Sequence, residues 1–376
     1  MKKVGIVTFH ASYNCGSILQ GMALQTILKD RIGVNPEIID FSNKNQKALY
    51  SVLYKKLTLK NIVKNMLCIP GYKHIKQHYE DYENYIRTHF ILSEGSYENT
   101  DELIGIEKNY DALICGSDQI WNVNCDDGDD AYFLSFAKNI KKVAYAPSLG
   151  AVNIANTPIE QKYRDFLMDF SALSVREENG KAWLESLTKR NVDLLLDPTL
   201  LLDKADWEKF IEPCDEIPSG QFIFYYAFSF SQENNRAVAK LARELQMPVI
   251  IIESKQWYIK GLSRYKEFHL TTHSSPNYFL NMMKNAACVI TTSFHGSAFS
   301  TIFGKKFLYI KGEKHDKQDD RTEGLLRRLG LLRRHVTVDQ ISKERLLEDI
   351  EYDSVHTKIK ELKKGSIAYL DKNLND

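Results

Sequence analysis

Short apolar runs alternate with helical patterns along the first half of the chain. Six such runs are KKVGIVTFH (2–10), PEIIDF (36–41), DALICGSD (111–118), KVAYAPSLG (142–150), ALSVRE (172–177) and VDLLLDPTLLL (192–202). Each run ends in polar residues or glycine, which is typical of a strand buried in a parallel sheet. An amphipathic pattern, ILQGMALQTILKDR (18–31), follows the first run. We therefore predict a doubly wound α/β unit that binds ligands at the carboxyl ends of its strands.

A second series of strands and helices begins near Trp207. Its apolar runs and the helical patterns between them lie at 220–230, 233–246, 247–254, 276–286, 287–296, 297–304 and 305–312. Charge, proline and glycine gather between the two series, which is typical of a domain boundary. We predict one Rossmann-like domain at 1–205, a second at 206–345, and a C-terminal helix at 346–376 that packs on either of them.

An aromatic and basic region, residues 46–90, interrupts the first series. Its pattern predicts helices inserted into the N-terminal domain. One interpretation is an insertion that covers the core of its own domain. The other is a surface for a lipid-linked or polymeric acceptor, because neighbouring tyrosines and lysines suit sugar rings and anionic headgroups.

The balance of charge limits the partners of this chain. With 50 basic and 49 acidic residues the formal net charge is +1, so no global field attracts nucleic acid or a membrane surface. We find no apolar run near the ~20 residues of a membrane span and no signal-peptide pattern, and expect a cytoplasmic protein. The 6 cysteines form no C-x-x-C pair, and CDDGDD (125–130) lacks the spacing of a calcium loop. We expect reduced thiols, a solvated turn and no metal.

The loop after the first strand holds three candidate binding residues. His10, Asn14 and Gly16 lie in TFHASYNCG, which opens a helix. Backbone amides and the positive end of a helix hold an anion or a sugar hydroxyl at such a place. In the alternative interpretation Asn14 and Gly16 only shape the turn and His10 belongs to the core.

Three further candidates follow the strand at 111–115, in ICGSDQIWN. Small residues, including Ser117, let a ligand approach the backbone, and Asp118 stands near the indole of Trp121. A carboxylate at this position orients a sugar hydroxyl or transfers a proton. The alternative is that Ser117 or Asp118 caps a helix.

Two charged or titratable residues end later strands. Arg176 carries a planar fork suited to a carboxylate or phosphate, or else forms an ion pair with Glu177, Glu178 or a neighbouring element. His295 follows the strand in ACVITTSFHG, next to small residues and at the entrance to a helix. A group that titrates near neutrality, placed beside helix-end donors, predicts an anion site with a general acid or base. Arg321 precedes a leucine-rich helix and is free to reach a ligand.

Taken together, these segments resemble the polysaccharide pyruvyl transferase family. The resemblance is carried by GIVTFHASYNCGSILQGMALQ, CGSDQIWN, YAPSLG, SVREENG, LLLDPTLLL and SPNYFLNMMKNAACVITTSFHGSAFSTIFGKKF. It implies two Rossmann-like domains facing a cleft, as in GT-B glycosyltransferases. It also implies transfer of an enolpyruvyl-derived group from phosphoenolpyruvate, as co-substrate, to a sugar, forming a pyruvate ketal. The donor-binding arginine of the family matches Arg176, and its histidine matches His295.

One departure from the family pattern concerns the donor. Some members carry arginine and leucine just before the histidine, where this chain has Ser293 and Phe294. A phosphorylated donor therefore lacks one cation here, and Arg321 or Lys305 is the candidate replacement. Ser293 and Gly296, which flank the histidine motif, complete the expected donor site.

The expected chemistry then has named participants. His295 acts as acid or base, Arg176 holds the donor, and Asp118 serves the acceptor with help from His10 and Asn14. The acceptor is a sugar of a cell-surface polysaccharide or its lipid-linked precursor, with peripheral membrane contact through that acceptor at the inner face.

Two other functions fit the same sequence. A GT-B glycosyltransferase would bind a nucleotide sugar through an acidic residue such as Glu253 or Glu313. A non-catalytic carbohydrate-binding assembly protein would bind sugar without turning over any donor.

Overall fold

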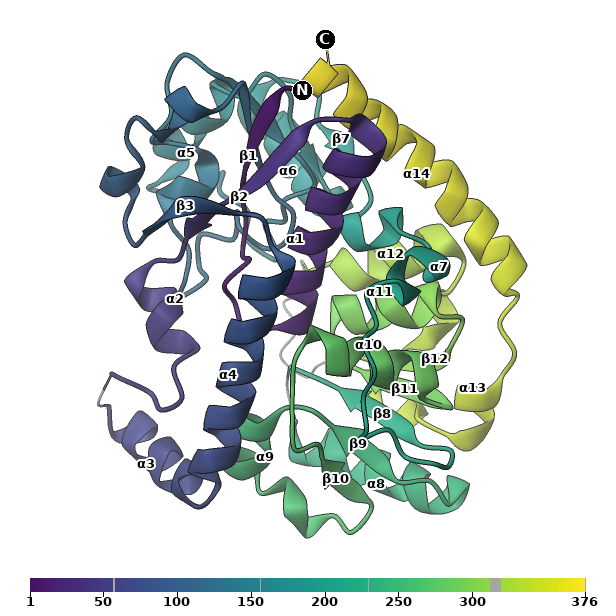
Figure 1. The fold of residues 1–376 in the computed structure, drawn as a ribbon. Helices are drawn as coiled ribbons and strands as arrows, with labels where there is room; N and C mark the ends of the chain where they lie inside the picture. Colours follow the sequence, from purple (N-terminus) through teal and green to yellow (C-terminus); the bar gives the residue numbers. More distant parts are fainter. Residues whose placement is uncertain (57, 156, 229, 312–318, 376) are drawn as a thin grey trace.

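The computed structural model describes residues 1–56, 58–155, 157–228, 230–311 and 319–375. It contains two parallel sheets with helices packed around them, one in each half of the chain (Figure 1). The predicted α/β class is confirmed, because every strand pair in both sheets is parallel.

The N-terminal sheet has the order β3-β2-β1-β4-β5. Its strands are β1 (Lys3–Val7), β2 (Asn35–Phe41), β3 (Leu92–Tyr97), β4 (Ala112–Cys115) and β5 (Lys141–Ala144). The order reverses between β1 and β4, which places the topological switch point, where such sheets bind ligands, at the ends of these two strands. A two-stranded sheet, β6 (Ser174–Val175) with β7 (Asp193–Leu194), continues the domain, since Val143 of β5 bridges to Ala172.

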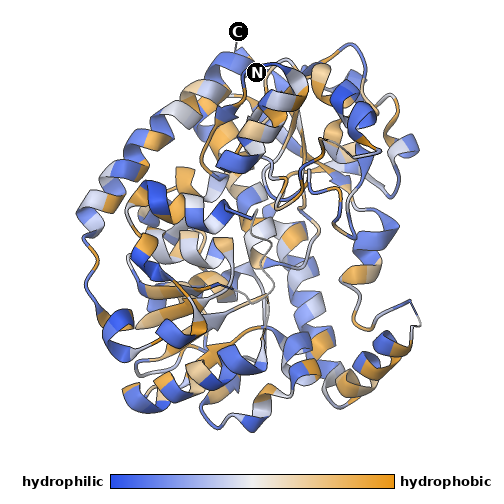
Figure 2. Ribbon diagram, turned by 180° about the vertical axis from the view of Figure 1, so that it is seen from behind, coloured by the Kyte–Doolittle hydropathy of each residue, from blue (hydrophilic) through white to orange (hydrophobic). Residues whose placement is uncertain are grey.

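The C-terminal sheet has the order β10-β9-β8-β11-β12-β13. Its strands are β8 (Ile223–Tyr226), β9 (Val249–Ile251), β10 (Phe268–Leu270), β11 (Cys288–Thr291), β12 (Lys306–Ile310) and β13 (His335–Val336). This is the strand order of the Rossmann fold, with its switch point between β8 and β11. Most of this sheet is orange in Figure 2, as expected for strands buried on both faces. The sequence pattern did not reveal three edge strands, β3, β10 and β13.

Helices surround the two sheets. Those of the N-terminal half are α1 (Cys15–Ile27), α2 (Lys44–Leu49), α3 (Leu59–Cys68), α4 (Tyr72–His89), α5 (Glu160–Met168), α6 (Glu178–Thr188) and α7 (Lys204–Glu208). The later ones are α8 (Gln232–Leu245), α9 (Ser254–Lys260), α10 (Pro276–Asn285), α11 (Phe294–Ile302), α12 (Arg321–Leu329), α13 (Lys343–Leu347) and α14 (Tyr352–Asn375). The helix after β11 begins at Phe294, three residues earlier than predicted, so His295 lies inside its first turn.

The final helix packs on both domains. Near its start, His356 Nε2 lies 3.2 Å from the carbonyl oxygen of Thr301 in α11. Near its end, the Tyr369 hydroxyl donates to the carbonyl of Ala144 in β5 at 2.9 Å. In Figure 1, α14 runs along the edge of the molecule from α13 back to the N-terminus. The C-terminus therefore lies next to the N-terminus.

The inserted region forms helices, as predicted, but it does not cover only its own domain. His74 Nε2 of α4 lies 2.7 Å from the carbonyl oxygen of Thr271, and His273 Nδ1 lies 3.0 Å from an oxygen of Asp81 in α4. Both partners belong to the C-terminal half. The insertion thus reaches across to the second domain beside α9 and β10 (Figure 1).

Candidate active site between the two domains

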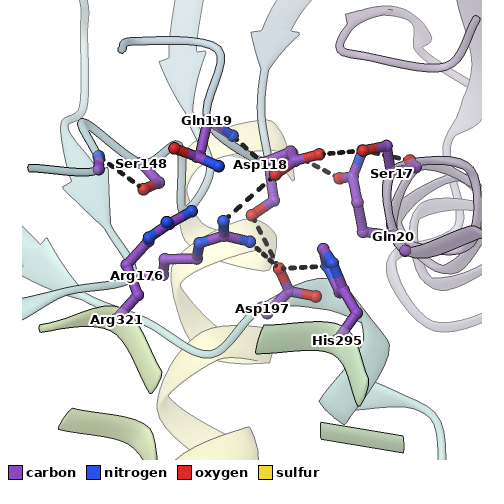
Figure 3. Close-up of polar contacts among 12 residues, drawn as sticks. Ser17, Gln20, Asp118, Gln119, Ser148, Arg176, Asp197, His295 and Arg321 are labelled. Atoms are coloured by element: carbon purple, nitrogen blue, oxygen red, sulfur yellow. Dashed lines mark hydrogen bonds and ion pairs between the residues drawn. The ribbon is translucent and has the colours of Figure 1, made fainter. Parts of the chain in front are cut away.

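The candidate site lies where the carboxyl ends of strands from both sheets meet. Asp118 follows β4, Arg176 follows β6 directly, and Asp197 comes shortly after β7. From the other domain, His295 stands in the first turn of α11 after β11. Figure 3 shows these four side chains converging, with Asp197 between Arg176 and His295.

Arg176 is held between two carboxylates. Its Nη1 donates to Asp197 Oδ2 at 2.6 Å and its Nη2 to Asp118 Oδ1 at 3.2 Å. The guanidinium also lies over the ring of Phe294, 4.5 Å from the centroid. Only 1% of the Arg176 side chain is exposed, so these contacts are made away from bulk water. The ion pairs therefore join Arg176 to neighbouring elements, through Asp118 and Asp197, as one of the alternatives predicted, and not to Glu177 or Glu178.

His295 meets this cluster from the opposite domain. Its Nε2 lies 3.5 Å from Asp197 Oδ2, and protonation of the ring turns this contact into an ion pair. Asp197 Oδ1 accepts from both the amide and the hydroxyl of Thr199, at 3.0 and 2.7 Å, which fixes the carboxylate. A fixed carboxylate next to an imidazole orients the ring.

Asp118 joins the cluster to helix α1. Its Oδ2 accepts a hydrogen bond from the Ser17 hydroxyl at 2.5 Å, while its Oδ1 also accepts from the amide of Gln119 at 2.8 Å. The backbone of Asp118 has φ 66, a left-handed conformation that aspartate tolerates better than most residues. This turn aims the carboxylate at Arg176.

Two glycines allow close packing at the site, one in α1 and one in α11. A Cβ on Gly16 would stand 2.2 Å from His295 Nδ1, so α1 and the imidazole are in direct contact only because residue 16 is glycine. A Cβ on Gly296 would stand 2.0 Å from Thr291 Oγ1, so this glycine allows α11 to pack closely against β11. Both residues therefore have packing roles that differ from the ligand contacts expected of them.

A cavity of about 620 Å³ opens beside the cluster, and both domains line it. Its N-terminal side includes Phe9, Asn14, Ser17, Tyr50, Asp118, Gln119, Cys125, Asp127 and Arg176. Its C-terminal side includes Phe228, Ser231, Asn234, Lys260, Thr292, Phe294, His295, Tyr309, Arg321 and Thr322. Its volume lies within the range of small-molecule binding sites.

Charge shifts the protonation of the acids around this cavity. Burial by itself raises the pKa of Asp118, but Arg176 first and His295 second bring it below its ordinary value. The pKa of Asp197 is also lowered, because His295 and Arg176 outweigh its burial. Burial raises the pKa of Glu177 to about 7 and that of Asp127 to about 6. Asp127 is thus a buried acid at the cleft, and the expectation of a solvated turn at 125–130 is wrong for this residue.

Two more predicted residues reach the cavity. Asn14 caps α1, accepting from the amides of Gly16 at 2.9 Å and Ser17 at 3.4 Å, and its Oδ1 also accepts from the Tyr226 hydroxyl at 3.2 Å. Arg321 begins α12 and forms two hydrogen bonds with Asp319, at 2.8 and 2.6 Å. Asn14 therefore links the two switch points, and Arg321 supplies a second guanidinium.

The structure does not bring Lys305, Trp121 or His10 to the cavity. Lys305 precedes β12, at the opposite edge of the sheet, and its ammonium donates to the carbonyls of Lys284 and Ala286. Trp121 is fully buried, and its indole N–H donates to the carbonyl of Tyr132. His10 is buried next to Asp40, with Nε2 at 3.0 Å from the carboxylate. Both side chains are 0% exposed and lie inside the N-terminal domain.

Ser117 and Ser293 lie behind the site. The Ser117 hydroxyl is 2.6 Å from the carbonyl oxygen of Ala146 and 3.2 Å from Asp197 Oδ2, so it supports the carboxylate. Ser293 is the N-cap residue of α11, and its buried hydroxyl has no hydrogen-bond partner among the described residues. Neither hydroxyl lines the cavity.

Sequence reasoning missed two members of the cluster. Asp197 interrupts the apolar run LLLDPTLLL at the end of a strand, and this charge in an apolar context was the available signal. Ser17 carries no comparable signal, since a serine in the first turn of a helix is ordinary. Its role depends on the approach of α1 to β4.

Neither a metal cluster nor a membrane span appears in the part of the chain that the structure describes. The described residues contain no group of three or more His, Cys, Asp or Glu side chains that could hold a metal ion. None of the described helices is long and apolar enough to cross a bilayer.

Two Rossmann-like domains with a site between them define a GT-B-type fold. Two solved structures with this arrangement are similar over nearly the whole chain. Staphylococcus aureus MnaA in complex with UDP has a TM-score of 0.53 at 12% identity, covering 99% of this chain and 91% of that one. A UDP-N-acetylglucosamine 2-epimerase has a TM-score of 0.51 at 11% identity, covering 99% and 90%. At such identities the likeness shows the fold alone.

The family is shown by the sequence itself. The sequence model described as polysaccharide pyruvyl transferase matches residues 14–313. The chain therefore belongs to the polysaccharide pyruvyl transferase family, a family of transferases that act on sugar polymers. No curated protein matches the chain.

Proposed function

We propose that this protein transfers the enolpyruvyl-derived group of phosphoenolpyruvate to two hydroxyls of a sugar, forming a cyclic pyruvate ketal. The sugar belongs to a cell-surface polysaccharide or to its lipid-linked precursor, and the reaction takes place in the cytoplasm, at the inner face of the membrane. The observation that carries this proposal is the buried cluster of His295, Asp197, Arg176 and Asp118, assembled from both domains in a chain of this family.

The proposed reaction is balanced without another reactant. A proton is added to the methylene carbon of the donor, which leaves an oxocarbenium-like centre at its neighbour. One sugar hydroxyl attacks this carbon, and its proton replaces the one given to the methylene carbon. The C–O bond to phosphate then breaks, a second hydroxyl closes the ring, and the proton of that hydroxyl is taken up by the departing phosphate. One donor and one diol give one ketal and one inorganic phosphate.

His295 is proposed as the group that moves the proton. It lies in the first turn of α11, and its Nε2 is 3.5 Å from the carboxylate of Asp197, which orients the ring. A general acid of this kind contributes about 10²–10⁴-fold to a rate. Asp118 faces the same cavity and stays ionised because its pKa is lowered, so it suits the role of base or orienting group for the acceptor.

The negative charge of the donor requires a second cation besides Arg176. Because Asp118 and Asp197 already pair with that guanidinium, we assign Arg176 to hold both carboxylates and to share the donor with Arg321. Arg321 lines the same cavity from the other domain. It is thus our candidate for the cation absent before His295, and the placement of Lys305 removes the other candidate.

The acceptor enters along a second hollow of about 290 Å³, which shares Asn14, Tyr50 and Phe228 with the cavity. Tyr13, Tyr54, Tyr79 and Tyr82 also line this hollow. Aromatic faces with hydroxyl tips provide both apolar and polar contact for sugar rings.

The nucleotide-sugar alternative has weaker support from the residues. Its candidate Glu253 lines the second hollow, and burial raises its pKa to about 7, while Glu313 lies outside the described residues. The loop after β8, AFSFS at 227–231, has no glycine through which a pyrophosphate could approach the backbone.

The test is incubation with phosphoenolpyruvate and a panel of nitrophenyl sugars and lipid-linked sugars. We expect release of inorganic phosphate and an acceptor mass increased by pyruvate less water. His295→Gln and Asp197→Asn should each lower the rate at least ~100-fold. His269→Gln, at an exposed position of β10, is the matched control and should keep the wild-type rate.

Other outcomes decide between the functions. Turnover of a nucleotide sugar, with none of phosphoenolpyruvate, would replace the proposal by a glycosyltransferase. Binding of sugar with no turnover of any donor would show a carbohydrate-binding protein.

A further inference from the structure

Helix α3 turns its apolar side away from the protein. Its exposed apolar residues and the one that follows it are 40–80% exposed, and they are Leu59, Ile62, Val63, Met66, Leu67 and Ile69. The helix lies at the lower edge of the molecule in Figure 1 and is banded in orange and blue in Figure 2. A surface helix of a globular protein buries its apolar stripe, so α3 has the opposite orientation.

The polar side of α3 holds the helix in this orientation. Asn65 accepts from the amide of Tyr54 at 2.9 Å and donates to its carbonyl at 3.0 Å. Lys64 lies over the ring of Tyr54, 4.7 Å from the centroid, and Cys68 is buried. Since the inner contacts use the polar side, the aliphatic side is left for an external apolar phase.

Positive charge surrounds this apolar face. Residues 44–79 contain no Asp or Glu, and their lysines are Lys44, Lys47, Lys55, Lys56, Lys60, Lys64, Lys73 and Lys76. Lys55, Lys56, Lys60 and Lys73 are exposed close to α3. The whole chain has a net charge of only +1. Residues 44–79, which include α3, are therefore a cationic segment of an otherwise balanced protein.

We propose that α3 docks on an anionic lipid bilayer, with its aliphatic face in the boundary between headgroups and acyl chains and its lysines at the headgroups. An amphipathic helix with basic flanks binds a bilayer in this way, parallel to its surface. An anionic polymer such as nucleic acid would explain the lysines, but it gives no reason for six exposed aliphatic side chains. The exposed apolar face therefore favours a lipid bilayer over an anionic polymer as the partner.

The docking surface is continuous with the cleft. Tyr54, whose backbone binds Asn65 of α3, also lines the second hollow, which shares three lining residues with the cavity beside His295. A sugar carried by a membrane lipid would thus reach the site from the side that touches the membrane. This last step rests on the proposed function, whereas docking itself requires neither donor nor acceptor.

The test is cosedimentation of the full chain with vesicles, in the absence of any substrate. We expect binding to vesicles of phosphatidylcholine and phosphatidylglycerol in equal parts, and much weaker binding to phosphatidylcholine alone. Val63→Glu/Met66→Glu should weaken the binding at least ~10-fold, because both side chains leave the apolar phase. Lys56→Gln/Lys60→Gln should weaken it about tenfold at low salt and reduce its salt dependence.

Met168→Glu is the matched control, since Met168 is exposed on α5 and far along the chain from α3. It should bind vesicles as the wild type does, and all variants should keep the wild-type circular dichroism. The proposal is overturned if the wild type stays in the supernatant, or if the α3 variant binds equally well. It is also overturned if light scattering shows a wild-type dimer that the α3 variant dissociates, since the face would then join two copies.

Discussion

Gly16 of α1 lies directly against the imidazole of His295, across the boundary between the two domains. A methyl group at position 16 would overlap the imidazole, with 2.2 Å between Cβ and Nδ1. Gly16→Ala should therefore displace the ring from Asp197 and lower kcat about 10–100-fold, because small misplacements of a reacting group are costly. The measurement is the rate of phosphate release, with the thermal midpoint taken on the same sample.

Gly365→Ala provides the control for that change. Residue 365 lies in α14 with no atom near enough to meet a new methyl group. Alanine should raise the free energy of unfolding by about 1 kcal/mol and leave kcat unchanged. If Gly16→Ala also left kcat unchanged in a folded protein, contact with His295 would have no catalytic consequence.

Glu177 gives a pH dependence with a definite sign. Burial raises its pKa from 4.5 to about 7, so the folded protein binds a proton that the unfolded chain has lost between these pH values. The contribution of Glu177 to stability therefore falls as pH rises through this window, by about 3 kcal/mol in total. Glu177→Gln should remove this loss of stability. The free energy of unfolding of the variant, relative to the wild type, should therefore rise between about pH 4.5 and 8.

Urea unfolding at a series of pH values measures this difference. Glu244→Gln is the control, because Glu244 forms an exposed pair with Lys240 at 3.8 Å. Exposed pairs of this kind contribute under ~1 kcal/mol. If the free energies of unfolding of the wild type and of Glu177→Gln had the same pH dependence, ionisation of Glu177 would not destabilise the folded protein.

At the scale of the element, α14 is part of the core that both domains share. Leu370 is 0% exposed and belongs to the largest apolar cluster. Leu370→Ala should lower the free energy of unfolding by about 2–5 kcal/mol, as expected for a cavity in a packed core. Denaturant titration checks this value, and Leu332→Ala, at a 41% exposed position, should cost less than ~0.5 kcal/mol. Equal, small losses in the two variants would mean that α14 is only loosely attached.

At the scale of the whole molecule, one apolar cluster runs through both domains. It contains Ile6 and Ile38 of the N-terminal sheet together with Phe224 and Val289 of the C-terminal sheet. Helix α1 contacts α10 across the domain boundary. Two domains that share a core are expected to unfold together.

Native-state hydrogen exchange tests this cooperativity. The most protected amides of β1 and β11 should exchange at the same free energy, equal to that of global unfolding. A lower value in one sheet would show that its domain opens while the other remains folded, and the shared cluster would then not couple them.

Much of the fold could be predicted from the sequence because strand and helix patterns are local. Apolar runs located the central strands of both sheets, and the polar residues that end them placed Asp118, Arg176 and His295 at carboxyl edges. The family followed from the same segments. These features depend on periodicity and on neighbours in the chain, which a sequence displays directly.

Contacts between distant residues were decided only by the tertiary structure. Asp197 joins Arg176 to His295 from 21 positions beyond the arginine, and Gly16 meets His295 across the domain boundary. Lys305 carries the right charge but lies at the wrong edge of its sheet. The pattern of residues 46–90 predicted helices, whereas hydrogen bonds between Asn65 and Tyr54 determined which side of α3 faces outward. Local preference selects the element, and the packing of elements selects which of its side chains meet.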